Sequence, residues 1–229
     1  MTDRETLRLS AALMLGGQLL YIVVTLFHTG GPANDHPVIF AAYAASESWK
    51  FVHLCQFASM AILVAGLFAL HCALGVQAGT ARLASRFGAA AAVVTLALYA
   101  VLQGVDGIAN KQAVDAWVSA PAAEKAARFA SAEAIRWLEW GVRSYQNMVL
   151  GVAVILLAAA VVRTGGIPRP LGYLMGLSGL SYLVQGWVVG DQGFSGTETI
   201  AIELAYVLDL AWMIWLVVIA WRMEDSESS

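Results

Sequence analysis

The stretch RWLEWGVRSYQNMVLGVAVILLAAAVV, residues 136–162, decides the fold class because it joins a long apolar run to a polar beginning. About 20 mainly apolar residues span a bilayer as a helix, so this segment predicts a transmembrane helix that is longer than needed. Its polar beginning is expected to extend beyond the hydrocarbon layer. A nearly unbroken stripe of ionisable and amide side chains lies in its first half: Arg136, Glu139, Arg143, Gln146 and Asn147.

The composition places the whole chain in the same class. Of its 229 residues, 59% are hydrophobic and 13% are charged, and the mean hydropathy is +0.69. A soluble domain usually carries about 25% charged residues, so an ordinary soluble globule is excluded. The net charge is −3 without a basic tract, so nucleic acid is not expected as a partner. Cys55 and Cys72 are too far apart along one predicted helix to form a disulfide.

Six apolar segments are long enough to cross a membrane. They are residues 9–28, 50–73, 85–107, 136–162, 170–190 and 200–221. The first lacks a small-residue cleavage site and is predicted to be retained as a span. The prediction is an all-α integral membrane protein with one six-helix domain, residues 1–222, and a short acidic cytoplasmic tail, residues 223–229. Short interfacial helices are expected in the outer loops, 29–49 and 111–135, with Ser119 and Pro121 starting a helix.

The orientation follows from the basic residues in the loops. Six crossings put both termini on one side, together with Arg4, Arg8, Arg82, Arg86, Arg163, Arg169 and Arg222. The loops on the other side contain Lys50, Lys111, Lys125 and Arg128. Cytoplasmic loops carry the excess of Lys and Arg, so both termini are predicted to be cytoplasmic.

The other predicted spans carry polar stripes as well. They consist of Gln18, Tyr21, Thr25 and His28; Lys50, His53 and Gln56; Gln103, Asp106 and Asn110; Ser178, Tyr182 and Gln185; and Glu203, Tyr206 and Asp209. Almost all of them fall in the outer half of the bilayer, whereas the inner half has little beyond His71. The pattern predicts a shared polar cavity that opens outward or into the outer leaflet. Ionisable groups inside spans are costly, so each is a functional candidate.

Structural roles compete with functional ones for these residues. Amide stripes often join helices by hydrogen bonds. Glu139 and Arg143 stand at i and i+4, where they can neutralise each other. Asp209 lies near the bilayer midplane without a basic neighbour on its own helix. It is therefore expected to pair with another helix, with Arg143 as the first choice, to bind a metal, or to stay protonated.

Two histidines suggest an alternative metal or haem site. His28 ends the first span and His53 starts the second, so both lie at the same outer depth. This arrangement allows bis-histidine haem ligation, or a zinc site completed by Asp106, Glu139 or Glu203. A hydrogen-bonded structural histidine is the commoner case, so no metal or cofactor is predicted, with haem or zinc as the alternative. His36 is expected to be solvated in a turn.

Three stretches carry a resemblance to a known group of proteins. They are HPVIFAAYAASESWKFVHLCQF (36–57), LQGVDGIANKQAVDAW (102–117) and SAEAIRWLEWGVRSYQNMVLG (131–151). Over roughly residues 28–165 the chain resembles an uncharacterised family of bacterial, mainly actinobacterial, six-span membrane proteins. The resemblance implies six helices and a bacterial inner membrane, and it implies no reaction or substrate.

The leading hypothesis is an intramembrane enzyme that uses buried carboxylates for acid–base chemistry on a lipophilic small molecule, such as an isoprenoid or lipid. A lyase, isomerase, cyclase or hydrolase fits this chemistry. The predicted catalytic residues are Asp209, Glu203, Glu139, Asp106, Arg143 and His53. The predicted substrate-binding residues are Tyr206, Tyr182, Trp140, Gln146, Asn147, Gln185, Gln103, Gln56 and Arg136. Membrane lipids are the expected partners.

Two further function classes stay open beside the enzyme. A transporter of a small solute or of protons would use Asp106, Glu139, Glu203 and Asp209, although the apolar inner half leaves its path incomplete. A structural or sensor subunit would use the polar cluster only to hold its helices together.

Overall fold

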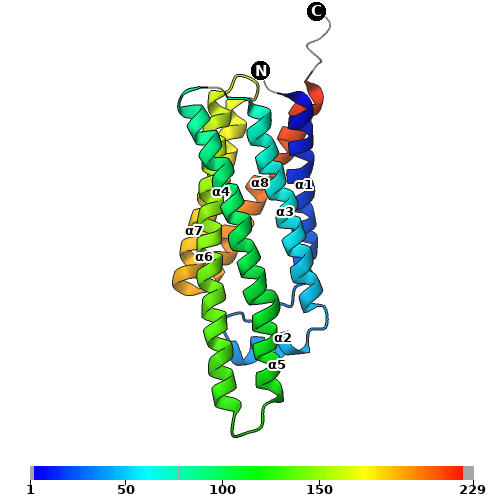
Figure 1. Cartoon of the computed structure of the whole chain (residues 1–229), viewed down its shortest axis with the longest axis vertical. Helices are drawn as coiled ribbons and strands as arrows, with labels where there is room; N and C mark the ends of the chain where they lie inside the picture. The colour runs from blue at the N-terminus through cyan, green and yellow to red at the C-terminus, as the bar shows by residue number, and fades with distance from the viewer. Residues whose placement is uncertain (1–2, 77, 224–229) are drawn as a thin grey trace, which may run out of the picture.

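The computed structural model describes residues 3–76 and 78–223, and every regular element in these ranges is a helix (Figure 1). The elements are α1 (Arg4–Thr25), α2 (His36–Ala45), α3 (Trp49–Leu74), α4 (Gly79–Gln103), the π-helical segment η1 (Gly104–Asn110), α5 (Lys111–Ser119), α6 (Lys125–Arg163), α7 (Arg169–Gln192) and α8 (Gly196–Arg222). The predicted all-α class is confirmed. Residues 224–229 of the predicted acidic tail lie outside the described ranges.

Five helical segments are long and apolar enough to cross a membrane: Arg4–Thr25, Trp49–Leu74, Gly79–Ser119, Lys125–Arg163 and Gly196–Arg222. The chain is therefore a multi-pass membrane protein by length and composition. The third segment runs well past the predicted end at residue 107 because η1 and α5 continue α4 without a break. Helix α7 is not among the five, since glycine and polar residues are spread along its sequence RPLGYLMGLSGLSYLVQGWVVGDQ and leave no stretch of 18 residues that is apolar enough.

Six long helices form a closed ring in the order α1, α3, α4, α6, α7 and α8, with each helix packed against the next. The first residue of α1 and the last of α8 lie at the same end of the bundle, which we call the terminal end (Figure 1). There the side chain of Arg8 donates from Nε to the carbonyl oxygen of Ala220, at 3.0 Å. This contact joins the first helix of the ring to the last.

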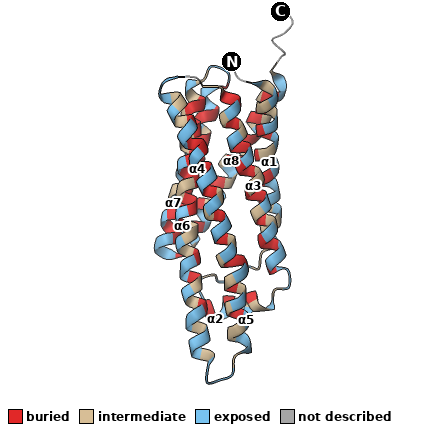
Figure 2. Cartoon of the chain, in the orientation of Figure 1, coloured by how far each residue is buried: buried red, intermediate tan, exposed pale blue. Residues whose placement is uncertain are grey.

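The terminal half of the ring is filled by apolar side chains. Leu7, Leu67, Leu157 and Leu216 are fully buried there, and Figure 2 shows buried residues along the helix sides that face one another. Helices α6 and α7 approach closely through glycines, since a Cβ atom on Gly151 would lie 2.6 Å from the carbonyl oxygen of Gly179. Such close backbone approach is typical of helix packing in membranes.

At the other end of the bundle, which we call the hairpin end, α5 and the 39-residue helix α6 extend past the ring (Figure 1). Helix α2 packs on this hairpin through a small apolar cluster that includes Ile39, Phe40, Val114 and Ala132. The loop 29–49 thus contains the predicted short helix. Residues 111–135 instead form the hairpin itself.

Two local predictions at the hairpin end are wrong. Ser119 is the last residue of α5, since Ala120 is extended, and Pro121 begins a turn in which its carbonyl oxygen accepts from the Glu124 amide. His36 is buried instead of solvated. Its Nδ1 lies 2.8 Å from Oε1 of Glu133, so the start of α2 is tied to α6.

Candidate metal centre and adjoining cavities

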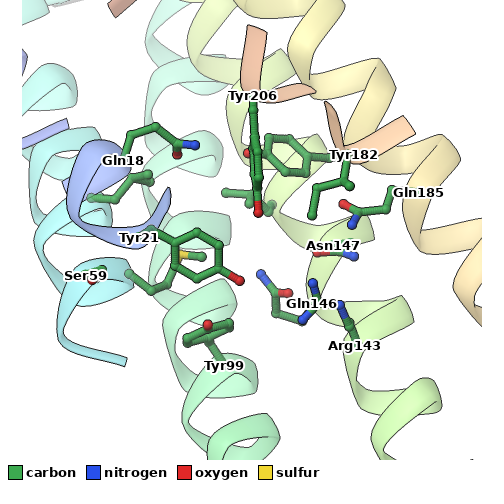
Figure 3. A pocket seen from close by; sticks show the side chains of 14 residues that line it. Gln18, Tyr21, Ser59, Tyr99, Arg143, Gln146, Asn147, Tyr182, Gln185 and Tyr206 are labelled. Atoms are coloured by element: carbon green, nitrogen blue, oxygen red, sulfur yellow. The ribbon is translucent and has the colours of Figure 1, made fainter. Parts of the chain in front are cut away.

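The polar faces of all six ring helices meet in two adjoining cavities. The deep cavity, of about 20 Å³, is lined by at least one residue of each helix, including Gln18, Ser59, Tyr99, Arg143, Tyr182 and Tyr206 (Figure 3). The outer cavity, of about 380 Å³, lies toward the hairpin end and includes His28, Asp106, Glu139 and Glu203 in its lining. Tyr21, Arg143, Ile202 and Tyr206 line both.

Three potential metal ligands converge beside the outer cavity. His28 follows the end of α1, His53 lies in the first turns of α3, and Asp106 lies on η1. One ligand atom from each lies within 4.8 Å of the other two. The backbone of η1 can approach α3 because residue 107 is glycine, where a Cβ atom would lie 2.8 Å from Cβ of His53. π-Helical segments within longer helices occur frequently at functional sites.

Hydrogen bonds fix the orientation of both imidazole rings. Nδ1 of His53 donates to the carbonyl oxygen of Trp49 at 2.7 Å, and Nδ1 of His28 donates to that of Thr29 at 3.1 Å. In the neutral tautomer this leaves Nε2 of each ring with a free lone pair. Burial lowers the pKa of His28 to about 4, so this ring is neutral near pH 7. Metal-binding histidines in proteins usually donate their other ring nitrogen in this way.

The carboxylate of Asp106 faces one of these lone pairs. Nε2 of His53 lies 3.1 Å from Oδ2 of Asp106, so the two atoms need either a proton or a metal ion between them. Oδ1 accepts from Nδ2 of Asn110 at 3.3 Å, and the indole of Trp49 donates to the backbone carbonyl of Asp106 at 3.1 Å. These contacts direct the other carboxylate oxygen, Oδ2, toward His53.

The donor set suits a small divalent cation. Zinc–ligand bonds of about 2.0–2.2 Å place neighbouring ligand atoms roughly 3.3 Å apart in a tetrahedral site, close to the spacing between His53 and Asp106. Two histidines and one carboxylate with a further position open is a ligand set used by catalytic zinc and by non-haem iron. The outer cavity supplies room for the open position.

Glu139 forms an ion pair with a different arginine from the one expected. Its Oε2 lies 2.6 Å from Nη1 of Arg136, and both side chains are almost completely buried. Nη2 of Arg136 also donates to the carbonyl oxygen of Ala33 at 3.2 Å. Asn110 donates to Glu139 as well as to Asp106, at 3.4 Å, so it connects this ion pair to the candidate metal ligands.

The predicted pair between Asp209 and Arg143 is not formed. Asp209 accepts hydrogen bonds from the hydroxyl of Tyr182 at 2.6 Å and from Nε1 of Trp212 at 2.9 Å. It lines neither cavity. Arg143 has no ion pair with any residue in the described ranges, and its Nε is buried without a hydrogen-bond partner. Its guanidinium lies 5.4 Å from the centre of the Phe194 ring.

The other predicted site residues divide between the two cavities and the packing around them. Gln146, Asn147, Gln185 and Tyr206 line the deep cavity, and Gln56, Gln103, Arg136 and Glu203 line the outer one. Glu203 is exposed, whereas Gln185 donates to the buried Glu198 at 2.7 Å. Trp140 lines neither cavity and packs against Phe194.

Three residues that shape the site were not predicted as site residues. Tyr99 precedes Gln103 by one helical turn, so extending the polar stripe on that span would have found it. Trp49 was not singled out in the sequence, and its ring contacts both His28 and His53. Glu198 lies just before the predicted sixth span and turns inward on the first turn of α8.

The comparisons with known proteins identify the family. No curated protein and no solved structure matches the chain. A family model does match over residues 19–220, a wider range than the resemblance seen in the sequence, and the expected relation to an uncharacterised family is confirmed. The chain belongs to the family described as Domain of unknown function (DUF4386).

Proposed function

We propose that the chain is a membrane-embedded metalloenzyme that hydrolyses an ester bond in a lipophilic molecule. One observation carries the proposal: His28 and His53 both donate Nδ1–H to backbone carbonyls, and their ligand atoms converge with Asp106 beside a cavity of about 380 Å³. Zinc is the first choice for the ion, since it accepts two imidazoles and a carboxylate and keeps a position for water.

Two polar residues of the outer cavity, Glu139 and Arg136, have a part in this reaction beside the candidate metal ligands. A bound zinc ion supplies Lewis acidity that brings the pKa of water to about 7. Glu139 accepts the proton that leaves the attacking water, and Arg136 holds its carboxylate in place through the 2.6 Å ion pair. The water oxygen bonds to the carbonyl carbon, the carbon–oxygen ester bond breaks, and the leaving alcohol takes up the proton. An acid and an alcohol are the products.

The geometry favours a single ion over haem. The rings of His28 and His53 lie 5.1 Å apart at an interplanar angle of 57°, and Trp49 packs against both of them. A macrocycle between two axial histidines needs more separation than this, with no side chain in its plane. One carboxylate oxygen of Asp106 also lies within 4.8 Å of a ring nitrogen of each histidine.

A lipophilic substrate fits the surroundings of the outer cavity. Leu26, Phe27 and Ile200 are exposed on the segments that also supply His28 and Thr199 to the cavity lining. In a bilayer these side chains face the hydrocarbon or its boundary. A molecule with an apolar chain can lie against them while its ester group enters the cavity.

Hydrolysis of 4-nitrophenyl octanoate tests the proposed reaction. Purified protein in mild detergent is expected to release 4-nitrophenol, to lose this activity on treatment with a chelator, and to regain it with zinc. Glu139→Gln removes the proton acceptor and is expected to lower the rate by about 10²–10⁴-fold. Glu124→Gln serves as the control, because Glu124 is exposed and lies directly before the first residue of α6. Chelator-resistant hydrolysis would argue against the metal.

A second candidate function is acid–base catalysis without a metal. Asn110 holds the carboxylates of Asp106 and Glu139 together, and a proton shared between Asp106 and His53 explains their 3.1 Å contact equally well. Asp209 is a poor acid for this scheme, because it lines neither cavity. Metal content separates the two candidates.

We further propose that α7 is a sixth crossing and that both termini lie in the cytoplasm of a bacterial inner membrane. Helix α7 has 24 residues, about 36 Å of helix, and is a member of the ring. Green fluorescent protein fused to the C-terminus is expected to fluoresce, and alkaline phosphatase inserted between α5 and α6 is expected to be active. Loss of both signals would reverse the orientation, and activity of only one reporter would place this loop and the C-terminus on the same side and indicate an odd number of crossings.

A further inference from the structure

Two arginines on one face of α6 differ in whether they have an ion-pair partner. Arg136 and Arg143 are seven residues apart, which brings them to the same side of the helix. Arg136 is compensated by Glu139 at 2.6 Å. Arg143 has no carboxylate within ion-pair distance anywhere in residues 3–76 and 78–223, although it lines both cavities. A charge placed in a membrane protein interior without a partner is costly and marks a functional site.

The nearby carboxylates on α8 have other surroundings. Glu198 accepts a hydrogen bond from Gln185 at 2.7 Å, and Glu203 is exposed in the lining of the outer cavity. The charge of Glu198 acts on Arg143 without an ion pair between them, so the guanidinium of Arg143 has no carboxylate in direct contact. An arginine cannot accept hydrogen bonds and stays charged, so its missing partner has to be an acceptor.

Other unpartnered donors surround the same space. Nε2 of Gln18, Nε2 of Gln146 and Nδ2 of Asn147 are buried without a hydrogen-bond partner, as is one acceptor, Oε1 of Gln185. All four residues line the deep cavity together with Arg143, and Figure 3 shows these side chains around one common space. Buried polar groups are normally hydrogen-bonded, so a cluster of free donors indicates an absent acceptor.

The sizes of the two cavities limit what this acceptor is. The deep cavity of about 20 Å³ has room for about one water-sized group, such as one oxygen of an oxyanion. The outer cavity of about 380 Å³ continues from it past Arg143 and Tyr206 toward His28 and Asp106. One ligand can thus place an anionic group at Arg143 and its body beside the candidate metal centre.

We propose that Arg143, with the side-chain amides of Gln146 and Asn147, binds the anionic group of the substrate, a carboxylate or a phosphate. The substrate is then an amphiphilic anion whose scissile bond lies between this group and the metal centre. The anion site itself stands on the geometry of Arg143 and of the unpartnered amide donors around the deep cavity. Only the statement that its ligand is the substrate rests on the proposed function.

Binding of simple amphiphiles tests the anion site. Sodium octanoate, octyl phosphate and uncharged octanol are titrated into purified protein in mild detergent, with binding heat and melting temperature as readouts. Octanoate or octyl phosphate is expected to bind and raise the melting temperature, and the stronger of the two identifies the anion. Octanol is expected to bind at least tenfold more weakly. Equal affinity for octanol and both anions would overturn the proposal.

Matched variants assign the effect to Arg143. Arg143→Gln is expected to weaken anion binding at least tenfold, whereas Arg163→Gln, an exposed position on the same helix, is expected to leave it unchanged. Asn147→Leu, which removes a donor and no charge, is expected to weaken binding several-fold and covers the case in which Arg143→Gln does not fold. Unchanged affinity in Asn147→Leu together with unchanged affinity or misfolding of Arg143→Gln would overturn the proposal.

The same assay keeps the two proposals distinguishable. In His53→Ala, anion binding is expected to persist even though the candidate metal centre is removed. Persistent binding with no metal in the wild type would contradict the metalloenzyme alone. Metal-dependent hydrolysis with no anion binding would contradict the anion site alone.

Discussion

Replacing Arg136 by methionine is expected to lower the free energy of unfolding by about 3–5 kcal/mol, whereas the same replacement at Arg143 is expected to lower it little or to raise it. Removal of Arg136 leaves the carboxylate of Glu139 buried and without its 2.6 Å partner. Removal of Arg143 strands no carboxylate, because none lies within ion-pair distance in the described ranges. The two arginines have similar chemistry, so the difference isolates the effect of the partner.

Equilibrium unfolding in mild detergent without added anions measures this contrast. Arg163→Met, at an exposed position near the end of α6, gives the baseline for losing an arginine from this helix. A second test is the double replacement Arg136→Met with Glu139→Leu, which is expected to recover most of the loss since neither charge is left alone. Equal destabilisation by Arg136→Met and Arg143→Met would show that Arg143 also has a carboxylate partner.

Wild-type protein purified after growth with zinc is expected to carry one zinc ion per chain, and His53→Ala is expected to carry none. Elemental analysis of iron, zinc and copper measures the stoichiometry directly. His71→Ala is the matched control, because His71 bonds to Ser85 in the terminal half of the bundle, remote from the outer cavity. A wild type without metal, or a His53→Ala variant that retains it, would contradict the proposed ligand set.

Two glycine variants test whether the spacing of the ligands matters. Gly107→Ala keeps every ligand but places a Cβ atom 2.8 Å from Cβ of His53, so the ring must shift and the metal content is expected to fall. Gly104→Ala lies one turn away on η1, where an added Cβ meets no atom within 4 Å, and it is expected to bind metal normally. Equal metal content in both variants would show that the site tolerates movement of His53.

The sequence predicted where the long helices lie, because their apolar runs are long. It misplaced the end of the third span, at residue 107, and the start of the fourth, at residue 136, because α5 and the first turns of α6 continue these helices through polar residues. It also predicted which polar residues lie at the same level of the bundle, since the position of a residue along a spanning helix fixes its distance from the helix ends. It could not choose between partners on one helix. Glu139 has Arg136 three residues before it and Arg143 four residues after it, and both spacings permit an ion pair. The choice is made by Ala33 and Asn110, which bond to Arg136 and Glu139 from other segments.

The histidine cluster could be predicted only in outline. The matching depth of His28 and His53 indicated that they lie close together, and Asp106 was among the carboxylates expected beside them. The tautomers could not be inferred, because they depend on the carbonyl groups of Trp49 and Thr29 at the ends of two helices. For Asp209 the sequence indicated the position in the membrane but not the hydrogen-bond partners. Its burial was foreseen, but its partners Tyr182 and Trp212 are neutral, and a sequence gives no preference for neutral donors over a distant arginine.

The closed ring of helices has a consequence for how the protein is made. Its polar interior is shared by all six long helices, so no smaller set of them encloses the charged face of α6. During synthesis α6 enters the membrane before α7 and α8 exist, with Arg136, Glu139 and Arg143 still facing lipid or the insertion machinery. The ring of helices closes only when α8 packs against α1. Truncation before α8 should therefore leave a substrate for membrane quality-control proteases, with a lifetime far shorter than that of the full chain.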